Sequence, residues 1–172
     1  MIQNSKFKIK NSKKGFTLIE MLVVIFVLGI GLVGALSFFN INLNSQFEAK
    51  NELIAAGLAQ EGADLVRNIR DYNQLNSSTR TWDQELAACN NKGIDFNSLT
   101  GALAQLHKCV SNTNVYIDSN SRYNQSGSGT TAAFTRKIEV TAPDAASRKI
   151  ICTVSWNGRT TTATDILYNN SY

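Results

Sequence analysis

The sequence feature that most constrains this chain is an apolar run from Met21 to Phe39, in which Ser37 is the only polar residue. A helix rises about 1.5 Å per residue, so residues 16–39 would span roughly 36 Å as one helix. This length exceeds the hydrocarbon core of a bilayer, which is about 30 Å thick, so the helix can cross a membrane with some tilt. The run therefore predicts a transmembrane helix over residues 16–39.

The charges on the two sides of this run predict its orientation. No acidic residue lies in the first fifteen positions, which hold five lysines: Lys6, Lys8, Lys10, Lys13 and Lys14. No charged residue of either sign lies between Met21 and Phe47. Because basic flanks remain on the cytoplasmic side, we expect a single-pass protein of the cytoplasmic membrane. Its N-terminus would lie inside, and everything after Phe39 would be exported.

The same lysines account for the basic character of the chain. The formal net charge is +4, with 17 Lys and Arg residues against 13 Asp and Glu residues. Without the five leader lysines, 12 basic residues face the 13 acidic ones. The rest of the chain is thus close to neutral, and its composition does not indicate binding to nucleic acid.

A cleaved secretory signal and an uncleaved signal anchor are the two simpler interpretations of the apolar run. A cleaved signal would have a shorter apolar stretch followed by a small-residue cleavage site, whereas this run leads into Asn40, Ile41 and Asn42. A signal anchor explains the length but not Glu20, because a carboxylate within a spanning helix costs a few kcal/mol on insertion scales. Glu20 can lower this cost by reaching toward the cytoplasmic edge.

The residues that join the leader to the run, KKGFTLIEMLVV at positions 13–24, resemble the class III signal of type IV pilins and of type II secretion pseudopilins. The resemblance implies that a prepilin peptidase, which is also the N-methyltransferase, cleaves between Gly15 and Phe16. It further implies that Phe16 becomes the N-methylated first residue of the mature chain. The glutamate at the position of Glu20 is a signature of the family.

The spacing of Phe16 and Glu20 has its own physical meaning. In a helix these residues are i and i+4, one turn apart on the same face. Cleavage would create a positive amine at Phe16 in a region of low dielectric constant, where an unpaired charge is costly. Glu20 of one subunit can neutralise the amine of a neighbour. The family resemblance implies this pairing between subunits, and Glu20 is therefore a candidate assembly residue.

The helix is expected to continue beyond the membrane to about Asp71. Its composition favours helix, and apolar residues recur at helical spacing: Phe47, Ile54, Leu58, Leu65 and Ile69. Such a stripe predicts a helix that packs on a sheet. Gly57 and Gly62 weigh against an unbroken helix.

The last forty residues are typical of antiparallel strands. Residues 134–142 and 149–156 alternate in polarity, and residues 159–168 are rich in threonine. Asn157-Gly158 favours a type I′ hairpin turn. We expect an α+β fold with three to four antiparallel strands, the fourth at residues 115–117.

The domains would be a cleaved leader (1–15), a transmembrane and filament-core helix (16–39) and an exported head (40–172) whose sheet spans about 134–168. Residues 81–110 are expected to form a short helix and loop, with Trp82, Leu86, Leu103 and Leu106 as core candidates. Residues 119–131 are expected to form a loop or a mobile insertion.

All three cysteines would be exported, where disulfides form. Cys89 and Cys109 lie together in the middle region and are the favoured pair, although the other two pairings stay open. Cys152 falls on the inward face of a predicted strand and fits a buried hydrophobe. The single His107 and the wide cysteine spacing do not suggest a zinc site. No cofactor, metal site or enzymatic activity is expected.

Three functions fit the sequence. The first is a structural subunit of a type IV filament, and residues 58–62 and 67–71 are similar to a stretch of minor pilins of the PilV kind. The second is a pseudopilin of a type II secretion or competence system, whose leader is the same. The third is a membrane-anchored ectodomain unrelated to filaments. For the first two, the expected partners are other pilin subunits, the prepilin peptidase, an assembly platform and, before assembly, the membrane; the filament would then lie at the cell surface.

Overall fold

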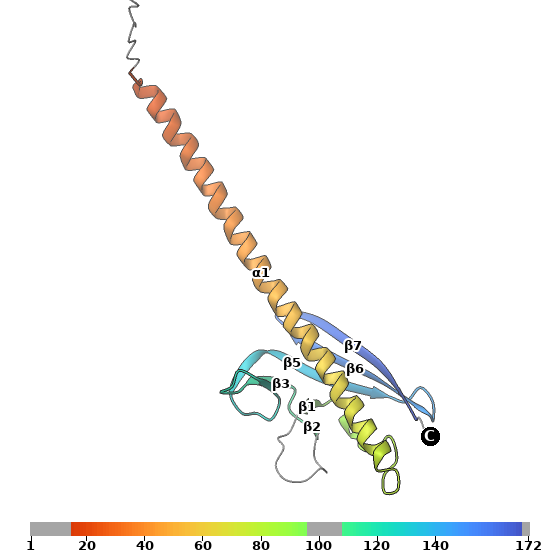
Figure 1. Ribbon diagram of the computed structural model, residues 1–172. Helices are drawn as coiled ribbons and strands as arrows, with labels where there is room; N and C mark the ends of the chain where they lie inside the picture. Colours follow the sequence, from red (N-terminus) through yellow and green to blue (C-terminus); the bar gives the residue numbers. More distant parts are fainter. Residues whose placement is uncertain (1–14, 96–107, 170–172) are drawn as a thin grey trace, which may run out of the picture. The chain divides into compact units, whose positions relative to one another are not determined.

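A computed structural model of the chain describes residues 15–95 and 108–169. Its main element is one helix, α1, from Leu18 to Leu75 (Figure 1). The chain divides into two compact units, residues 1–46 and residues 47–172. We call the second unit the head. The helix is continuous through Gly57 and Gly62 and ends beyond the expected position near Asp71.

In its described residues, 47–95 and 108–169, the head contains seven strands and a short 3-10 helix in addition to the later part of α1. In chain order the elements are η1 (Ala87–Cys89), β1 (Gly93–Asp95), β2 (Lys108–Val110), β3 (Asn114–Ile117), β4 (Tyr123–Asn124), β5 (Thr130–Thr141), β6 (Ser147–Trp156) and β7 (Arg159–Tyr168). Strands β1 and β2 form a separate antiparallel pair, and the main sheet has the order β4-β3-β5-β6-β7.

The α+β class is confirmed, with a long helix packed on antiparallel strands. The sheet is larger than the three to four strands expected: five strands, plus the two-stranded sheet. Strand β3 pairs with β5, as predicted for residues 115–117. The additional strands β1, β2 and β4 have two or three residues each, which is too short for a polarity pattern to reveal them.

The C-terminal hairpin follows the pattern of its sequence. Strands β6 and β7 pair without interruption from Trp156↔Arg159 to Ser147↔Tyr168. Asn157 and Gly158 have φ values of 45° and 76°, which is the left-handed backbone that a type I′ turn requires. On β6 the alternating residues Ile150, Cys152, Val154 and Trp156 are buried, as their spacing predicted.

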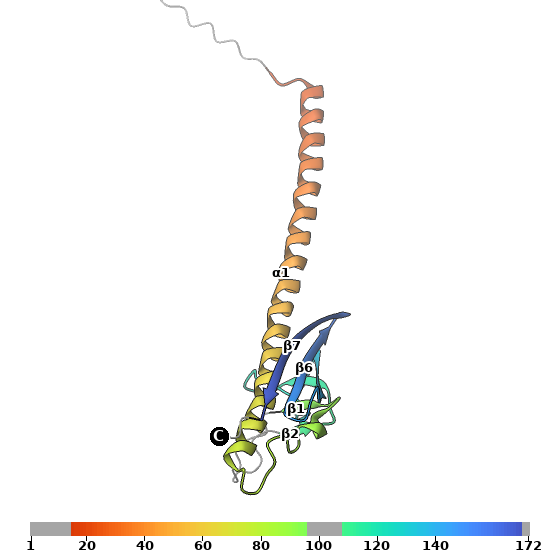
Figure 2. The same cartoon turned by 90° about the vertical axis from the view of Figure 1, so that its right-hand side faces the viewer.

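The head part of α1 packs on one face of the main sheet (Figures 1 and 2). Leu58, Leu65 and Ile69 of the predicted stripe are buried, whereas Phe47 is 62% exposed and lies outside the core. Gly62 lies where the helix closely approaches the sheet. A Cβ atom added there would collide with Sγ of Cys152 and lie 3.2 Å from Cδ of Arg136. Although glycine is a poor helix former, Gly62 therefore permits the helix to pack on the sheet.

A buried arginine links the helix to three other segments of the head. Arg136 on β5 is 1% exposed. Its Nε donates to Oε1 of Gln125 over 2.8 Å, and its Nη2 donates to the carbonyl oxygen of Ile94 over 2.6 Å. Its Nη1 lies 3.3 Å from the carbonyl oxygen of Leu58 and 3.2 Å from the carboxylate of Glu61. These bonds satisfy a charge that would otherwise be costly to bury.

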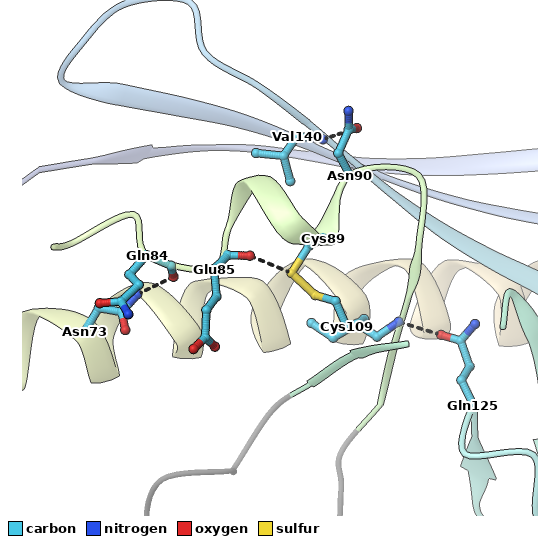
Figure 3. Close-up of a disulfide and its surroundings, with 9 residues drawn as sticks. Asn73, Gln84, Glu85, Cys89, Asn90, Cys109, Gln125 and Val140 are labelled. Carbon is cyan, nitrogen blue, oxygen red and sulfur yellow. Dashed lines mark hydrogen bonds between the residues drawn. A yellow bond between two sulfur atoms is a disulfide. The ribbon is translucent and has the colours of Figure 1, made fainter. Parts of the chain in front are cut away.

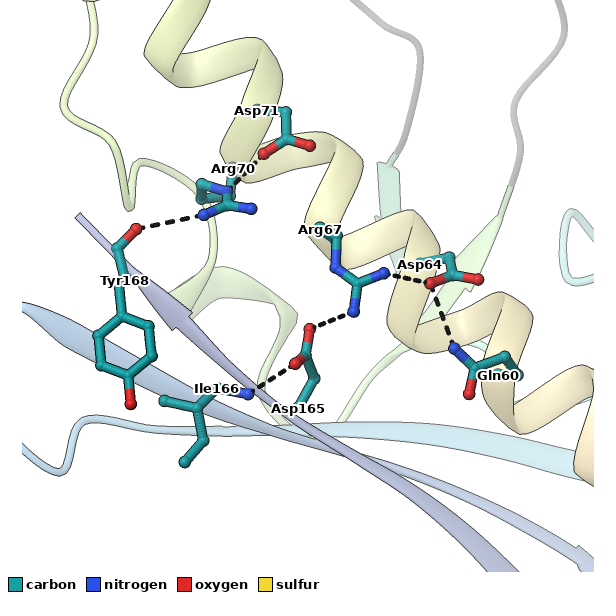
Figure 4. Close-up of polar contacts among 8 residues, drawn as sticks. All are labelled: Gln60, Asp64, Arg67, Arg70, Asp71, Asp165, Ile166 and Tyr168. Atoms are coloured by element: carbon teal, nitrogen blue, oxygen red, sulfur yellow. Dashed lines mark hydrogen bonds and ion pairs between the residues drawn. The ribbon is translucent and has the colours of Figure 1, made fainter. Parts of the chain in front are cut away.

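Strand β7 is tied to α1 by polar contacts along the edge of the sheet (Figure 4). Arg67 donates to Asp165 over 2.7 Å and to Asp64 over 2.7 Å. Arg70 donates to the carbonyl oxygen of Tyr168 over 3.3 Å. The hydrogen bond with Asp165 raises the pKa of the Arg67 guanidinium above its ordinary value. These contacts fix the edge of the sheet against the helix.

Candidate functional site

The residues predicted to be processed lie directly before α1. Gly15, Phe16 and Thr17 have no helical structure, and the helix begins at Leu18 (Figure 1). Nothing lies within 4 Å of a Cβ atom built on Gly15, and the Phe16 side chain is 72% exposed. The Gly15–Phe16 peptide bond is therefore in exposed, non-helical backbone.

Thr17 is the N-cap of α1. Its side-chain Oγ1 accepts a hydrogen bond from the backbone N–H of Glu20 over 3.3 Å. Its carbonyl oxygen accepts from the N–H groups of Glu20 and Met21 at 3.1 and 3.2 Å. The hydroxyl thereby satisfies one of the N–H groups that every helix start leaves without a partner. No role for Thr17 was expected from the sequence, although Thr17 and Glu20 have the spacing of a capping box.

Glu20 is exposed in the first turn of the helix. A carboxylate at this end is favoured by the helix dipole, whose positive end is the N-terminus. Within residues 15–95 and 108–169, no ion pair includes Glu20. Within the described part of the chain, the helix dipole is thus the interaction that favours a carboxylate at this position.

The helix that follows is apolar on all sides. Between Phe16 and Ile41 every large apolar side chain is exposed, from 42% for Val24 to 79% for Leu18. An apolar helix surface of this kind is stable only in lipid or against other helices. By length and composition, α1 is the one described helix able to cross a membrane.

A family comparison identifies the leader. The family model of the prokaryotic N-terminal methylation motif matches residues 10–36. The chain carries the prepilin-type leader of type IV pilins and pseudopilins. This match encloses Gly15, Phe16, Thr17 and Glu20 and supports a type IV pilin-like protein that is processed as a prepilin. Comparison with curated proteins and with solved structures gave no match.

The cysteines lie in the head, away from this leader in sequence. Cys89 and Cys109 form a disulfide with Cα atoms 5.0 Å apart (Figure 3), which joins η1 to β2. Closing a loop of 20 residues stabilises a small domain by about 3 kcal/mol. Next to this disulfide, Asn73 at the end of α1 donates to the carbonyl oxygens of Trp82 and Gln84. The disulfide and Asn73 together anchor the segment that follows α1.

The third cysteine has the environment of a core residue. Cys152 is fully buried and is not part of a disulfide. Burial raises the pKa of its thiol to about 12, so the thiol stays protonated and unreactive.

The structure places the other candidates as follows. Leu86 is buried and Trp82 is partly buried against the core, while Leu103, Leu106 and His107 lie outside the described residues. Among the residues that the structure describes, no group of three His, Cys, Asp or Glu side chains could hold a metal ion.

Proposed function

We propose that this protein is a structural subunit of a type IV filament, with the role of a minor pilin. The observation that carries the proposal is the prepilin-type motif at residues 10–36, which includes the start of a helix whose large apolar side chains are all exposed from Leu18 to Ile41. In the membrane this surface contacts lipid, and in a filament it contacts the same helix of neighbouring subunits.

Processing supplies the group that assembly requires. Hydrolysis adds water across the Gly15–Phe16 bond, leaving a carboxylate on Gly15 and an amine on Phe16. A methyltransferase then replaces a proton of this amine with a methyl group from its methyl donor. The methylated amine remains basic and pairs with Glu20 of an adjacent subunit, since both charges are costly when alone in an apolar filament core.

The choice of a minor pilin rests on the resemblance of residues 58–62 and 67–71. In the head these segments form the helix–sheet junction: Leu58 and Gly62 are buried, and Arg67 binds Asp165. A pseudopilin of a secretion or competence system has the same leader and is the alternative. Co-purification separates the two roles, because a minor pilin accompanies sheared surface filaments and a pseudopilin remains with the envelope machinery.

The mature N-terminus tests the proposal directly. We expect intact-mass measurement and terminal sequencing of the membrane-extracted protein to find N-methylated Phe16 as the first residue. Variants at Gly15 that block cleavage should accumulate in the membrane without entering filaments. A mature chain that retains Met1, or one cut beyond Phe39, would contradict the proposal.

A further inference from the structure

We propose that Thr17 is a positioning residue for leader cleavage: by capping α1, its hydroxyl holds the Gly15–Phe16 bond outside the helix at a fixed place before the first turn. This inference rests on the proposed function, because it concerns the same processing step. It assigns a role to a side chain that is neither at the bond to be cut nor at the assembly carboxylate.

The first step of the argument is where helical hydrogen bonding begins. The earliest N–H group bonded within α1 is that of Glu20, and its acceptors are the hydroxyl and carbonyl oxygens of Thr17. The Gly15–Phe16 bond precedes all of these bonds, so neither its N–H nor its carbonyl group belongs to the helix. A peptidase can therefore bind this backbone without first unwinding a turn.

The second step is that the residues before Thr17 do not favour an earlier start. Gly15 is a poor helix former. Lys13 and Lys14 would place positive charge in the first turn, where the helix dipole opposes it. The cap and the leader sequence thus agree on a start at Leu18. The family match over residues 10–36 supports the interpretation of this junction as one that is processed.

The third step is what happens without the cap. Removing an N-cap acceptor destabilises the first turn of a helix. The first turn, Leu18 to Met21, would then fray, and the bond would lose its fixed place relative to the helix. The peptidase would have to order these residues itself, which costs conformational entropy and slows the reaction.

The test compares side chains that cap with side chains that have the shape of threonine. Thr17→Val keeps the shape and removes the acceptor, whereas Thr17→Asn and Thr17→Ser change the shape and keep a good cap. The full-length precursor is incubated in membranes that contain prepilin peptidase, and the initial rate of conversion is followed by intact mass. Ser37→Val is the matched control, because it removes a hydroxyl from the same helix far from the cap.

We expect Thr17→Val to be cleaved at least about threefold more slowly than wild type, and the Asn, Ser and Ser37→Val variants to stay within about twofold. Equal rates for Thr17→Val and wild type would overturn the inference. Slow cleavage of Thr17→Asn would also overturn it, since the peptidase would then recognise side-chain shape. A wild-type precursor that is not cut at Gly15–Phe16 would instead contradict the proposed function.

Discussion

The two units of this chain differ in the burial of their apolar side chains. In the head, the stripe of α1 and the inward residues of β5 and β6 form a core in which residues such as Val66, Ile138 and Ile150 are fully buried. In residues 16–41, every large apolar side chain is at least 42% exposed. The head buries its apolar side chains within the chain itself, whereas those of the N-terminal helix can be buried only by lipid or by other helices.

Charged side chains show the same difference. Arg136 is buried in the head and finds its partners within the chain. Glu20 lies at the start of an apolar helix, and its proposed partner belongs to another subunit. Changes in the head should therefore alter the free energy of unfolding, and changes at the N-terminus should alter processing or assembly. Three sets of substitutions, at Arg136, at the glycines of α1 and at Glu20, test this division in order of decreasing effect on the stability of the head.

The largest effect is expected for Arg136→Met. Methionine fills a similar space but cannot donate hydrogen bonds, so Oε1 of Gln125 and the carbonyl oxygen of Ile94 lose a donor inside the core. Oε1 of Gln125 keeps its hydrogen bond from the N–H of Ile94, but the loss of the Arg136 donors inside the core should still lower the free energy of unfolding by about 2–4 kcal/mol. Urea unfolding of the soluble head, beginning at about Ser45, measures this change.

Glu61→Gln is the control for Arg136. The Glu61 side chain is 43% exposed, so losing its charge should cost less than about 1 kcal/mol. If Arg136→Met unfolds at the same urea concentration as wild type, the hydrogen bonds and ion pair of Arg136 contribute specificity of packing and not stability.

Arg136 also shows where sequence reasoning stops. It occupies an inward position on β5 between Phe134 and Ile138, and alternation predicts such a position without saying which partners it meets. Those partners, at Leu58, Ile94 and Gln125, are far apart in the sequence. The regular elements were predictable because α1, β6 and β7 repeat a local pattern over ten residues or more. The short strands β1, β2 and β4 depend on tertiary pairing and have no such pattern.

The candidate site divides in the same way. Gly15, Phe16 and Glu20 were predictable because the leader is a contiguous motif. Thr17 was in view in that motif, but its role depends on where the helix begins, and the apolar run alone does not specify the first helical residue.

A smaller effect, with opposite signs at two positions, is expected for the glycines of α1 in the head. Gly57 is exposed with no atom near its absent side chain, whereas a Cβ at Gly62 would collide with Cys152. Gly57→Ala should stabilise the head by up to about 1 kcal/mol, because alanine is the better helix former. Gly62→Ala should destabilise it by about 1–3 kcal/mol through overpacking.

The same urea unfolding assay checks both glycine variants, and each serves as the control for the other. The double variant Gly62→Ala with Cys152→Ala should recover part of the loss, since the smaller side chain removes the nearest obstacle. Equal stabilisation by alanine at both positions would mean that α1 does not approach the sheet closely at Gly62.

Glu20→Leu should have no effect on the head and a large effect on assembly. The substitution lies outside the head, so the free energy of unfolding should change by less than about 0.5 kcal/mol. Membrane insertion should be as good or better, because the cost of a carboxylate in a spanning helix exceeds what the helix dipole contributes. Orientation should hold, since the leader lysines are unchanged. Filament entry should fall, because the Phe16 amine of the neighbouring subunit loses its partner.

The measurement is the amount of protein in sheared filaments relative to its level in the membrane fraction, with co-purification with the major pilin as the readout for a minor component.

Two further variants separate charge from shape. Glu20→Gln keeps the size of the side chain and should fail like leucine if the charge is required. Glu20→Asp keeps the charge on a side chain one methylene shorter, so its defect should be milder. If Glu20→Leu enters filaments at the wild-type ratio, the Phe16 amine of the neighbouring subunit does not require the Glu20 carboxylate as its partner. The Thr17 cap and the helix dipole would then suffice to explain a glutamate at position 20. The two units would differ only in what covers their apolar side chains: the chain itself in the head, and lipid or other helices in the N-terminal unit.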